Sequence, residues 1–223
     1  RIAPGMHAIG SSAVMFLIIL HMLRAFLHFS SRFLAPVYSL GILIATLAVA
    51  ACFLGYSTTY GAMAHWALRV VQGLMRCLPF LDMWFYGNYI VTYNMLAKCL
   101  VFHFLVAVIT VVVVMYHIIQ LHSSGSSNGV ASSNGRYIAG YNARLVDLYW
   151  HVIVKDLVLA AFFWAVFGAI LMALMIVLHT DNNIIINARN PAQLSHIVPE
   201  WYLLPVYLLV KLVPSATAGL LVF

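Results

Sequence analysis

The sequence predicts an all-α membrane protein with about four complete spanning helices and an interfacial helix between the second and third spans. Hydrophobic residues make up 65% of the 223 residues and charged residues only 7%, whereas an ordinary soluble domain carries about a quarter charged residues. Four apolar runs also reach the roughly 20 residues that a helix needs to cross a bilayer. The mean hydropathy of +1.01 also indicates a membrane protein. A soluble globular protein is therefore excluded.

The small number of charged residues indicates what surrounds the chain. The 11 Lys and Arg residues exceed the 5 Asp and Glu residues only slightly, which is a thin basic excess and not a basic patch. Disordered chains and nucleic-acid-binding domains need many more charged residues. We therefore expect no nucleic-acid partner and expect the lipid bilayer to surround most of the chain.

Each of the four spans is a run of apolar residues bounded by polar or turn-forming residues. The third is the most apolar, since it contains four consecutive valines, Val111 to Val114. The expected spans are about Ala8–Leu27, Val37–Tyr56, Leu96–Leu121 and Val152–Leu178.

Two further segments have shorter helical patterns. Within Ala62–Cys77, apolar residues recur at intervals of three and four, and Arg69, Gln72 and Arg76 are expected on another face, as in a helix that lies along the membrane interface. After the polar segment 181–199, residues Glu200–Val213 predict a short helix that Pro214 ends.

The segment 123–135 is rich in Ser, Gly and Asn and is typical of an aqueous loop. It divides the chain into a first part, 1–122, a loop region, 123–151, and a last part, 152–223. Neither end of the sequence has the features of a natural terminus. We therefore expect the chain to be part of a larger membrane protein.

Histidines follow the same spacing on two spans. His7 and His21 are fourteen positions apart on the first span, as are His103 and His117 on the third. This spacing is about four helical turns, or roughly 21 Å, so both histidines of a span share one face. Two such helices side by side would present two facing pairs at two depths. This arrangement can hold two haems with both axial positions filled, which suits electron transfer and leaves no site for oxygen.

Two alternatives to haem ligation explain these histidines less well. A single membrane histidine more often forms a hydrogen bond to a neighbouring helix, but the matched spacing on two spans is hard to obtain that way. Zinc ligands cannot lie roughly 21 Å apart. Gly41 and Gly55 on the second span have the same fourteen-position spacing, and glycine lets a flat macrocycle approach the backbone closely. Arg24 could pair with a haem propionate or extend toward the membrane surface.

Three features together resemble one family. They are the paired histidines, the segment from Gly55 to Trp66, and above all the sequence Pro-Glu-Trp-Tyr at 199–202. They resemble the cytochrome b family of the cytochrome bc complex, which is respiratory complex III or ubiquinol–cytochrome c reductase. The resemblance covers nearly the whole chain, from the family's second spanning helix to the start of its sixth. It implies a di-haem transmembrane helical bundle.

The resemblance implies roles for individual residues. His7 with His103 resembles the ligand pair of the low-potential haem b, and His21 with His117 that of the high-potential haem b. Glu200 resembles the acid that binds quinol at the oxidation site and takes its proton, a role that suits a carboxylate at a pocket edge. The residues that resemble neighbours lining that pocket are Tyr56, Tyr202 and Tyr207.

At the opposite membrane face, the resemblance implies a quinone-reduction site with four residues: His122, Ser126, Lys155 and Asp156. His122 and Asp156 are candidate proton donors to the reduced quinone. A structural alternative is an ion pair that faces the loop. The family also implies ubiquinone and ubiquinol as substrates, the Rieske iron–sulfur and cytochrome c1 subunits as partners, and a dimeric complex. The expected location is the mitochondrial inner membrane, with a bacterial plasma membrane as the alternative.

Some positions depart from the family pattern. Pro4 stands where the family usually has an arginine, Thr59-Tyr60-Gly61 replaces Pro-Trp-Gly, and Ala67 replaces a glycine. The loop between Pro79 and Lys98 is expected to be shortened. These changes concern quinol and inhibitor contacts more than the haems.

The function implied is oxidation of quinol at one membrane face, passage of electrons through two b haems to quinone at the other face, and coupled proton translocation. Two rivals remain. A di-haem membrane anchor of another quinone-linked dehydrogenase would need the histidine pairs but not Glu200. A non-redox transporter would use the histidines as proton relays.

Overall fold

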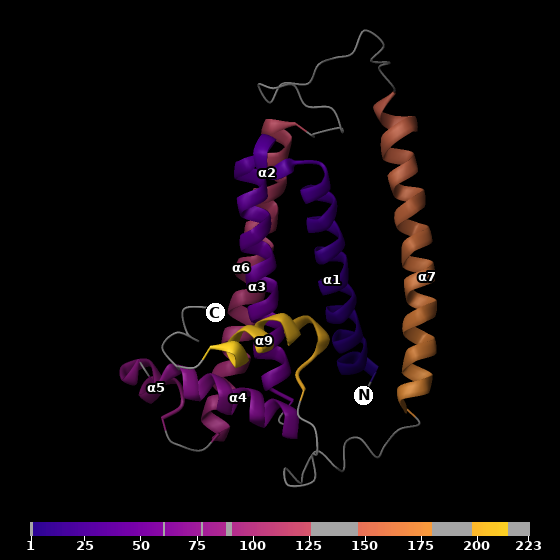
Figure 1. Cartoon of the computed structure of the whole chain (residues 1–223). Coiled ribbons are helices and arrows are strands. Elements are labelled where there is room, and N and C mark those ends of the chain that lie inside the picture. Colours follow the sequence, from indigo (N-terminus) through magenta and orange to yellow (C-terminus); the bar gives the residue numbers. More distant parts are fainter. Residues whose placement is uncertain are drawn as a thin grey trace.

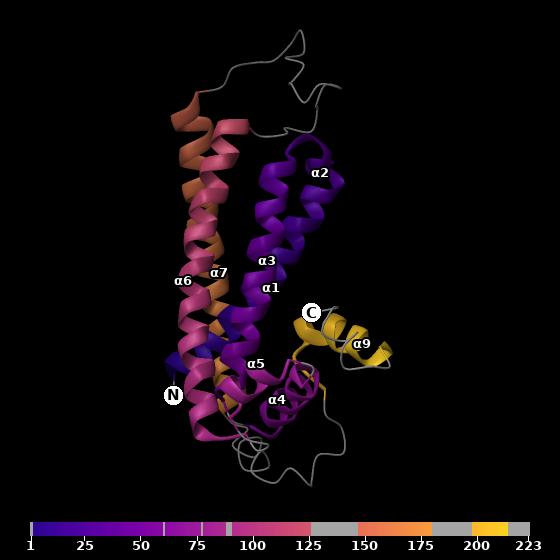
Figure 2. The ribbon, with the colours of Figure 1, turned by 90° about the vertical axis from the view of Figure 1, so that its left-hand side faces the viewer.

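Four long helices run alternately up and down in the computed structural model, and shorter helices gather at their ends (Figures 1 and 2). The structure describes residues 2–59, 61–76, 78–87, 91–125, 147–179 and 198–213. Within these ranges every regular element is helical, which confirms the predicted all-α class.

The long helices are α1 (Ile2–Leu27), α3 (Ala35–Ser57), α6 (Tyr93–Ser124) and α7 (Val154–His179), the last preceded by a π-helical turn, η1 (Leu148–Ile153). Four helices of the described part, with η1 and α7 counted as one, are long and apolar enough to cross a membrane. The four predicted spans are therefore confirmed. Helix α3 contacts both α1 and α6, and α7 contacts α1.

All four spans begin earlier than the hydropathy predicts, because residues that precede an apolar run can also be helical. Helix α1 includes Pro4 in its first turn, where a missing backbone N–H costs nothing. Helix α6 begins after Thr92, whose hydroxyl accepts a hydrogen bond from the backbone N–H of Met95 at 3.4 Å. His7 therefore lies inside its helix, near the start.

Two short helices were not predicted. Helix α2 (Ser30–Phe33) follows Phe29, whose φ of 55° lets the chain reverse direction between α1 and α3. Helix α5 (Pro79–Phe85) lies between α4 and α6, and the ammonium group of Lys98 donates hydrogen bonds to the carbonyl oxygens of Trp84 and Phe85 near its end. Neither has the length or periodicity that identifies a helix in the sequence.

The interfacial helix α4 (Ala62–Met75) forms where it was predicted, although Cys77 lies outside the described residues. One assignment within it is wrong. Gln72 is only 3% exposed, so it is buried like Leu68 one turn before it, although Arg76 lies one turn after it. A guanidinium N–H of Arg69 donates to the side-chain oxygen of Gln72 at 3.3 Å, which compensates for burying the amide.

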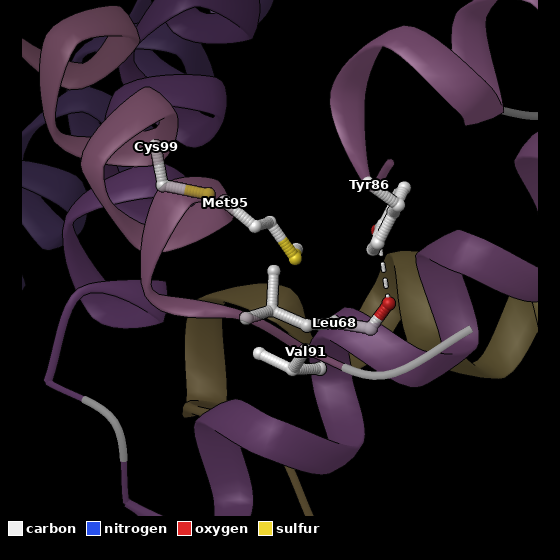
Figure 3. Packing of buried hydrophobic residues seen from close by; sticks show 5 residues of the cluster. All are labelled: Leu68, Tyr86, Val91, Met95 and Cys99. Atoms are coloured by element: carbon white, nitrogen blue, oxygen red, sulfur yellow. Dashed lines mark hydrogen bonds between the residues drawn. The ribbon is translucent and has the colours of Figure 1, made fainter. Parts of the chain in front are cut away.

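A cluster of buried hydrophobic residues joins α4, α5 and α6 (Figure 3). Its members are Leu68, Tyr86, Val91, Met95 and Cys99. The hydroxyl of Tyr86 donates to the backbone oxygen of Leu68 at 2.9 Å, so this buried hydroxyl has a partner. This packing holds the interfacial helix against the base of α6.

The two ends of the bundle differ. Helices α4, α5 and α9 (Leu204–Leu212) lie at the end where α1 begins, whereas α2, the end of α6 and the start of η1 lie at the other end (Figures 1 and 2). Helix α9 follows a 3-10 turn, η3 (Trp201–Leu203), so the helix predicted over Glu200–Val213 forms, with Glu200 just before it. Pro214 lies outside the described residues.

Candidate functional site

Helices α3 and α6 bring each predicted glycine opposite a predicted histidine. A methyl group built on Gly41 would lie 3.5 Å from Cε1 of His117, and one built on Gly55 would lie 2.9 Å from Cε1 of His103. The two helices are antiparallel, so the equal fourteen-position spacing produces both contacts at once. The absence of a side chain on α3 therefore makes room for two imidazoles at two levels of the bundle.

His103 is held in a defined orientation. Its Nδ1 lies 2.8 Å from the backbone oxygen of Ala51, one turn before Gly55 on α3. Since a carbonyl oxygen can only accept, Nδ1 carries the proton and Nε2 keeps a free lone pair. A carbonyl that fixes the tautomer in this way is typical of histidines that ligate metals.

The ring of His7 faces that of His103 across the gap between α1 and α6. The ring centroids are 6.0 Å apart, and the ring planes are perpendicular. Two metal–nitrogen bonds of about 2 Å, with each ring centre about 1 Å farther out, would separate the centroids of two axial imidazoles by about 6 Å. The spacing of His7 and His103 thus fits a pair of axial ligands to one iron.

His21 and His117 lie on the wall of one cavity of about 580 Å³. Arg24 and Gly41 line the same cavity. Nδ1 of His117 is shielded from solvent, and the backbone of Val37 lies within hydrogen-bonding reach of the imidazole. The volume lies in the range of small-molecule and cofactor pockets.

Three observations bear on whether the residues fit a haem at each level. The centroid separation of His7 and His103, the glycines that let each α6 imidazole lie against α3, and the cavity beside His21 and His117 are all compatible with a flat macrocycle held between the histidines. Arg24 adds a cationic group to the cavity for an acidic substituent. The residues present fit the group that the sequence predicts.

At the opposite end of α1 from Arg24, the Pro-Glu-Trp-Tyr sequence forms the turn η3, which contacts α1 and α3. Glu200 is exposed and lies just before the turn. The pKa of the Tyr202 hydroxyl is raised, first by burial and then by the neighbouring groups Cys52, Glu200 and Tyr56. Tyr202 therefore stays protonated at neutral pH and can donate a hydrogen bond. Tyr56 of α3, Tyr202 and Glu200 therefore lie close enough to interact electrostatically.

A second cavity, of about 250 Å³, lies between α3, α4 and the segment 198–210. Its lining is almost entirely apolar and includes Ala67, one of the departures from the family pattern, and Pro199. Tyr207 also lines it, and the ammonium group of Lys211 lies 5.5 Å from the centre of that tyrosine ring. The three tyrosines predicted to line the pocket thus occupy two positions. Tyr207 lies in the cavity wall, and Tyr56 and Tyr202 lie beside the cavity.

The residues expected at the other face are less closely grouped. His122 lies near the end of α6, and Lys155 and Asp156 lie near the start of α7; all three lie outside the buried core. These helix ends lie at the same end of the bundle (Figures 1 and 2). Among the described residues, no hydrogen bond or ion pair joins His122 to Lys155 or Asp156. Ser126 lies outside the described residues.

Several site residues were missed by the sequence analysis. Ala51 fixes His103, Ser12 accepts a hydrogen bond from Trp201, and His28 and Tyr38 line the larger cavity. Ala51 sits one turn before Gly55, so its role could have been inferred once α3 was paired with α6. The partner of Ser12 is 189 residues away, and no local pattern predicts it.

Comparisons with known proteins agree on one family. The family described as cytochrome b (N-terminal)/b6/petB matches residues 12–205. The cytochrome b of Toxoplasma gondii is 36% identical over 225 residues and is covered over 57% of its length, with 98% of this chain covered. That of Plasmodium falciparum is 33% identical over 221 residues, which cover 97% of this chain and 55% of the relative.

A fungal relative and a solved structure complete the comparison. The cytochrome b of Kluyveromyces lactis is 32% identical over 226 residues, covering 96% of this chain and 55% of the relative. The chain thus spans about half the length of the curated relatives it matches. A chain of a structure titled hyperthermophilic respiratory complex III superposes with a TM-score of 0.79 at 20% identity, covering 99% of this chain and 59% of that chain. At that identity the likeness shows the fold.

Proposed function

Since the chain belongs to the cytochrome b family, we propose that it is the cytochrome b subunit of a quinol–cytochrome c oxidoreductase. It oxidises quinol at the end of the bundle that carries α4 and α9, reduces quinone at the other end, and couples the two to proton translocation. The proposal rests on one arrangement. At two levels of the bundle, a histidine of α1 lies near a histidine of α6, and the α6 histidine lies against a glycine of α3.

Each level would hold one haem b. His7 and His103 would ligate the haem nearer to η3, and His21 and His117 the other, with Gly55 and Gly41 leaving room for the imidazoles of His103 and His117. When bound, the two haems supply one-electron carriers at two depths of the membrane. The Ala51 carbonyl keeps the lone pair on Nε2 of His103, and Arg24 provides a cation for a propionate.

At the quinol-oxidation site, the cavity beside Ala67 takes the apolar part of the quinol, since its lining is largely apolar. The carboxylate of Glu200 accepts a proton from a quinol hydroxyl and releases it to water, which its exposed position allows. Tyr202, which stays protonated, donates a hydrogen bond and orients the reacting oxygen. Tyr207 forms part of the cavity wall, and Tyr56 lies near Tyr202 beside the cavity.

At the quinone-reduction site, His122 and Asp156 supply protons to the reduced quinone, and Lys155 balances the charge that develops there. Ser126 is assigned to the same site on the resemblance alone. The placement of the end of α6 and the start of α7 at one end of the bundle supports this grouping.

The complete protein would work in a complex. We propose the Rieske iron–sulfur subunit and cytochrome c1 as its partners, a dimeric assembly, and the mitochondrial inner membrane as its location. The parasite and fungal relatives support a eukaryotic source. The division into 1–122, 123–151 and 152–223 remains our proposal for its organisation.

The experiment that tests the function is Glu200→Gln in membranes that contain the full-length protein. The amide keeps the shape of the side chain but cannot accept the proton, so quinol oxidation should fall by about a hundredfold, the scale of a lost general base. The absorption of both haems should be unchanged. Unaffected quinol oxidation would contradict the proposal and favour a di-haem membrane anchor.

A further inference from the structure

One hydrogen bond connects the Pro-Glu-Trp-Tyr turn to the helix that carries His7. The indole N–H of Trp201 donates to the hydroxyl oxygen of Ser12 on α1 at 2.8 Å, across a sequence separation of 189 residues. Ser12 is half-buried and lies five residues after His7, which is about 7.5 Å along the helix axis. The bond therefore ties η3 to α1 at a level close to the first histidine pair.

The other side of η3 is held differently. Leu203 is 7% exposed, so it anchors the turn by burial, and its backbone N–H donates to the oxygen of Glu200 at 2.8 Å. Tyr202 lies toward α3, within electrostatic range of Cys52 and Tyr56. The bond from Trp201 to Ser12 supplies a second, directional attachment to a different helix.

We propose that Ser12 is a positioning residue for quinol oxidation, acting through Trp201. By fixing η3 to α1, the hydroxyl of Ser12 sets the position of Glu200 and Tyr202 relative to His7 and His103. This inference rests on the proposed function, because the position of Glu200 matters only if Glu200 takes part in the reaction. A shift of about 1 Å in a reacting group can cost up to about a hundredfold in rate.

The neighbouring serine offers a matched control. Ser11 precedes Ser12 on the same helix and is also half-buried, but its hydroxyl donates to the backbone oxygen of Ala8 within α1, at 2.8 Å. Substituting Ser11 by alanine removes a hydroxyl of the same kind from the same turn. It leaves the connection to Trp201 in place.

The experiment compares Ser12→Ala, Ser12→Thr and Ser11→Ala in membranes that contain the full-length protein. We expect Ser12→Ala to lower kcat for quinol oxidation about tenfold with KM changed less than about twofold, since only the placement of the acceptor is altered. Ser12→Thr keeps a hydroxyl and should retain most of the activity. Ser11→Ala should behave like the unmodified protein, and the haem absorption of all three should be unchanged.

A double-mutant cycle identifies the partner. Trp201→Phe keeps an aromatic ring but removes the donor, so Ser12→Ala should cause little further loss in that background. Three results would each overturn the inference. They are equal losses of activity in Ser12→Ala and Ser11→Ala, additive losses in the double-mutant cycle, and lost haem absorption in Ser12→Ala. If Ser12→Ala is fully active while Glu200→Gln is impaired, the inference fails and the proposed function stands. If Glu200→Gln is also fully active, the proposed function fails as well.

Discussion

Gly55 of α3 and His103 of α6 are in such close contact that a methyl group on Gly55 would lie 2.9 Å from Cε1 and 3.0 Å from Nδ1 of the imidazole. The same imidazole forms a hydrogen bond with the backbone oxygen of Ala51, so it cannot move aside without losing that hydrogen bond. The contact explains why a glycine, which weakens a helix, stands within a membrane span.

Gly55→Ala should therefore displace His103 and weaken the first haem site. Overpacking of this kind costs about 1 to 3 kcal/mol. We expect a lower haem content per chain, with the lost absorption belonging to one haem only. Gly168→Ala on α7 is the control, because a methyl group there would meet nothing within 4 Å. Equal haem content in the two variants would contradict the assignment of Gly55.

Ala67 should control sensitivity to inhibitors of the quinol site. Its methyl group lines the apolar cavity, where it should crowd a rigid strobilurin-type inhibitor more than quinol. Ala67→Gly should lower the inhibitory concentration by about tenfold or more, the scale of one methylene in an apolar pocket, while the KM for quinol changes little. Ala25→Gly, a matched change in the other cavity, should have no such effect. Full sensitivity of the unmodified protein would contradict this expectation.

Tyr86 should stabilise the junction of α4, α5 and α6. Burial raises the pKa of its hydroxyl, which therefore remains protonated and donates to the oxygen of Leu68. Tyr86→Phe should lower the free energy of unfolding by about 1 kcal/mol, the net value of a typical hydrogen bond. Tyr149→Phe, at a side chain that is 58% exposed, should change it by less than about 0.5 kcal/mol. Thermal unfolding in detergent measures both.

His65 should make the stability of α4 depend on pH. Burial, and then the nearby charge of Arg69, lower its pKa in the folded protein from the ordinary 6.5. Below pH 6.5 the unfolded chain therefore binds more protons than the folded chain, so stability is lost as the pH falls through this range. Between pH 8 and pH 5.5 the thermal midpoint should fall less in His65→Gln than in the unmodified protein. The same fall in both would show that another group is responsible.

The sequence was sufficient to predict the features that repeat. Hydropathy identified the four spans, and the fourteen-position spacing identified the histidines and glycines before any of them could be placed in space. The structure added the antiparallel register that brings Gly41 to His117 and Gly55 to His103. Periodicity gives the face of one helix, but it does not give the partner of that face.

Features that depend on a single pair of residues could not be predicted. The bond from Trp201 to Ser12 joins distant parts of the chain, and the burial of Gln72 depends on a guanidinium one turn away. Gln72 was assigned to the polar face by its spacing from Arg69 and Arg76, but in the structure tertiary packing buries it. The short helices α2 and α5 depend on the reversal at Phe29 and on Pro79 at a helix start, signals that cover too few residues to be recognised.

Two haems held by four histidines of α1 and α6 are the centre of the proposed function. A reduced-minus-oxidised absorption spectrum of the purified protein, with haem quantified per chain and reduction titrated by potential, tests this assignment most directly. We predict two low-spin b-type haems with separated potentials, and the loss of one of them in His117→Leu. A protein with no haem, or with only one, would contradict the assignment of His7, His21, His103 and His117.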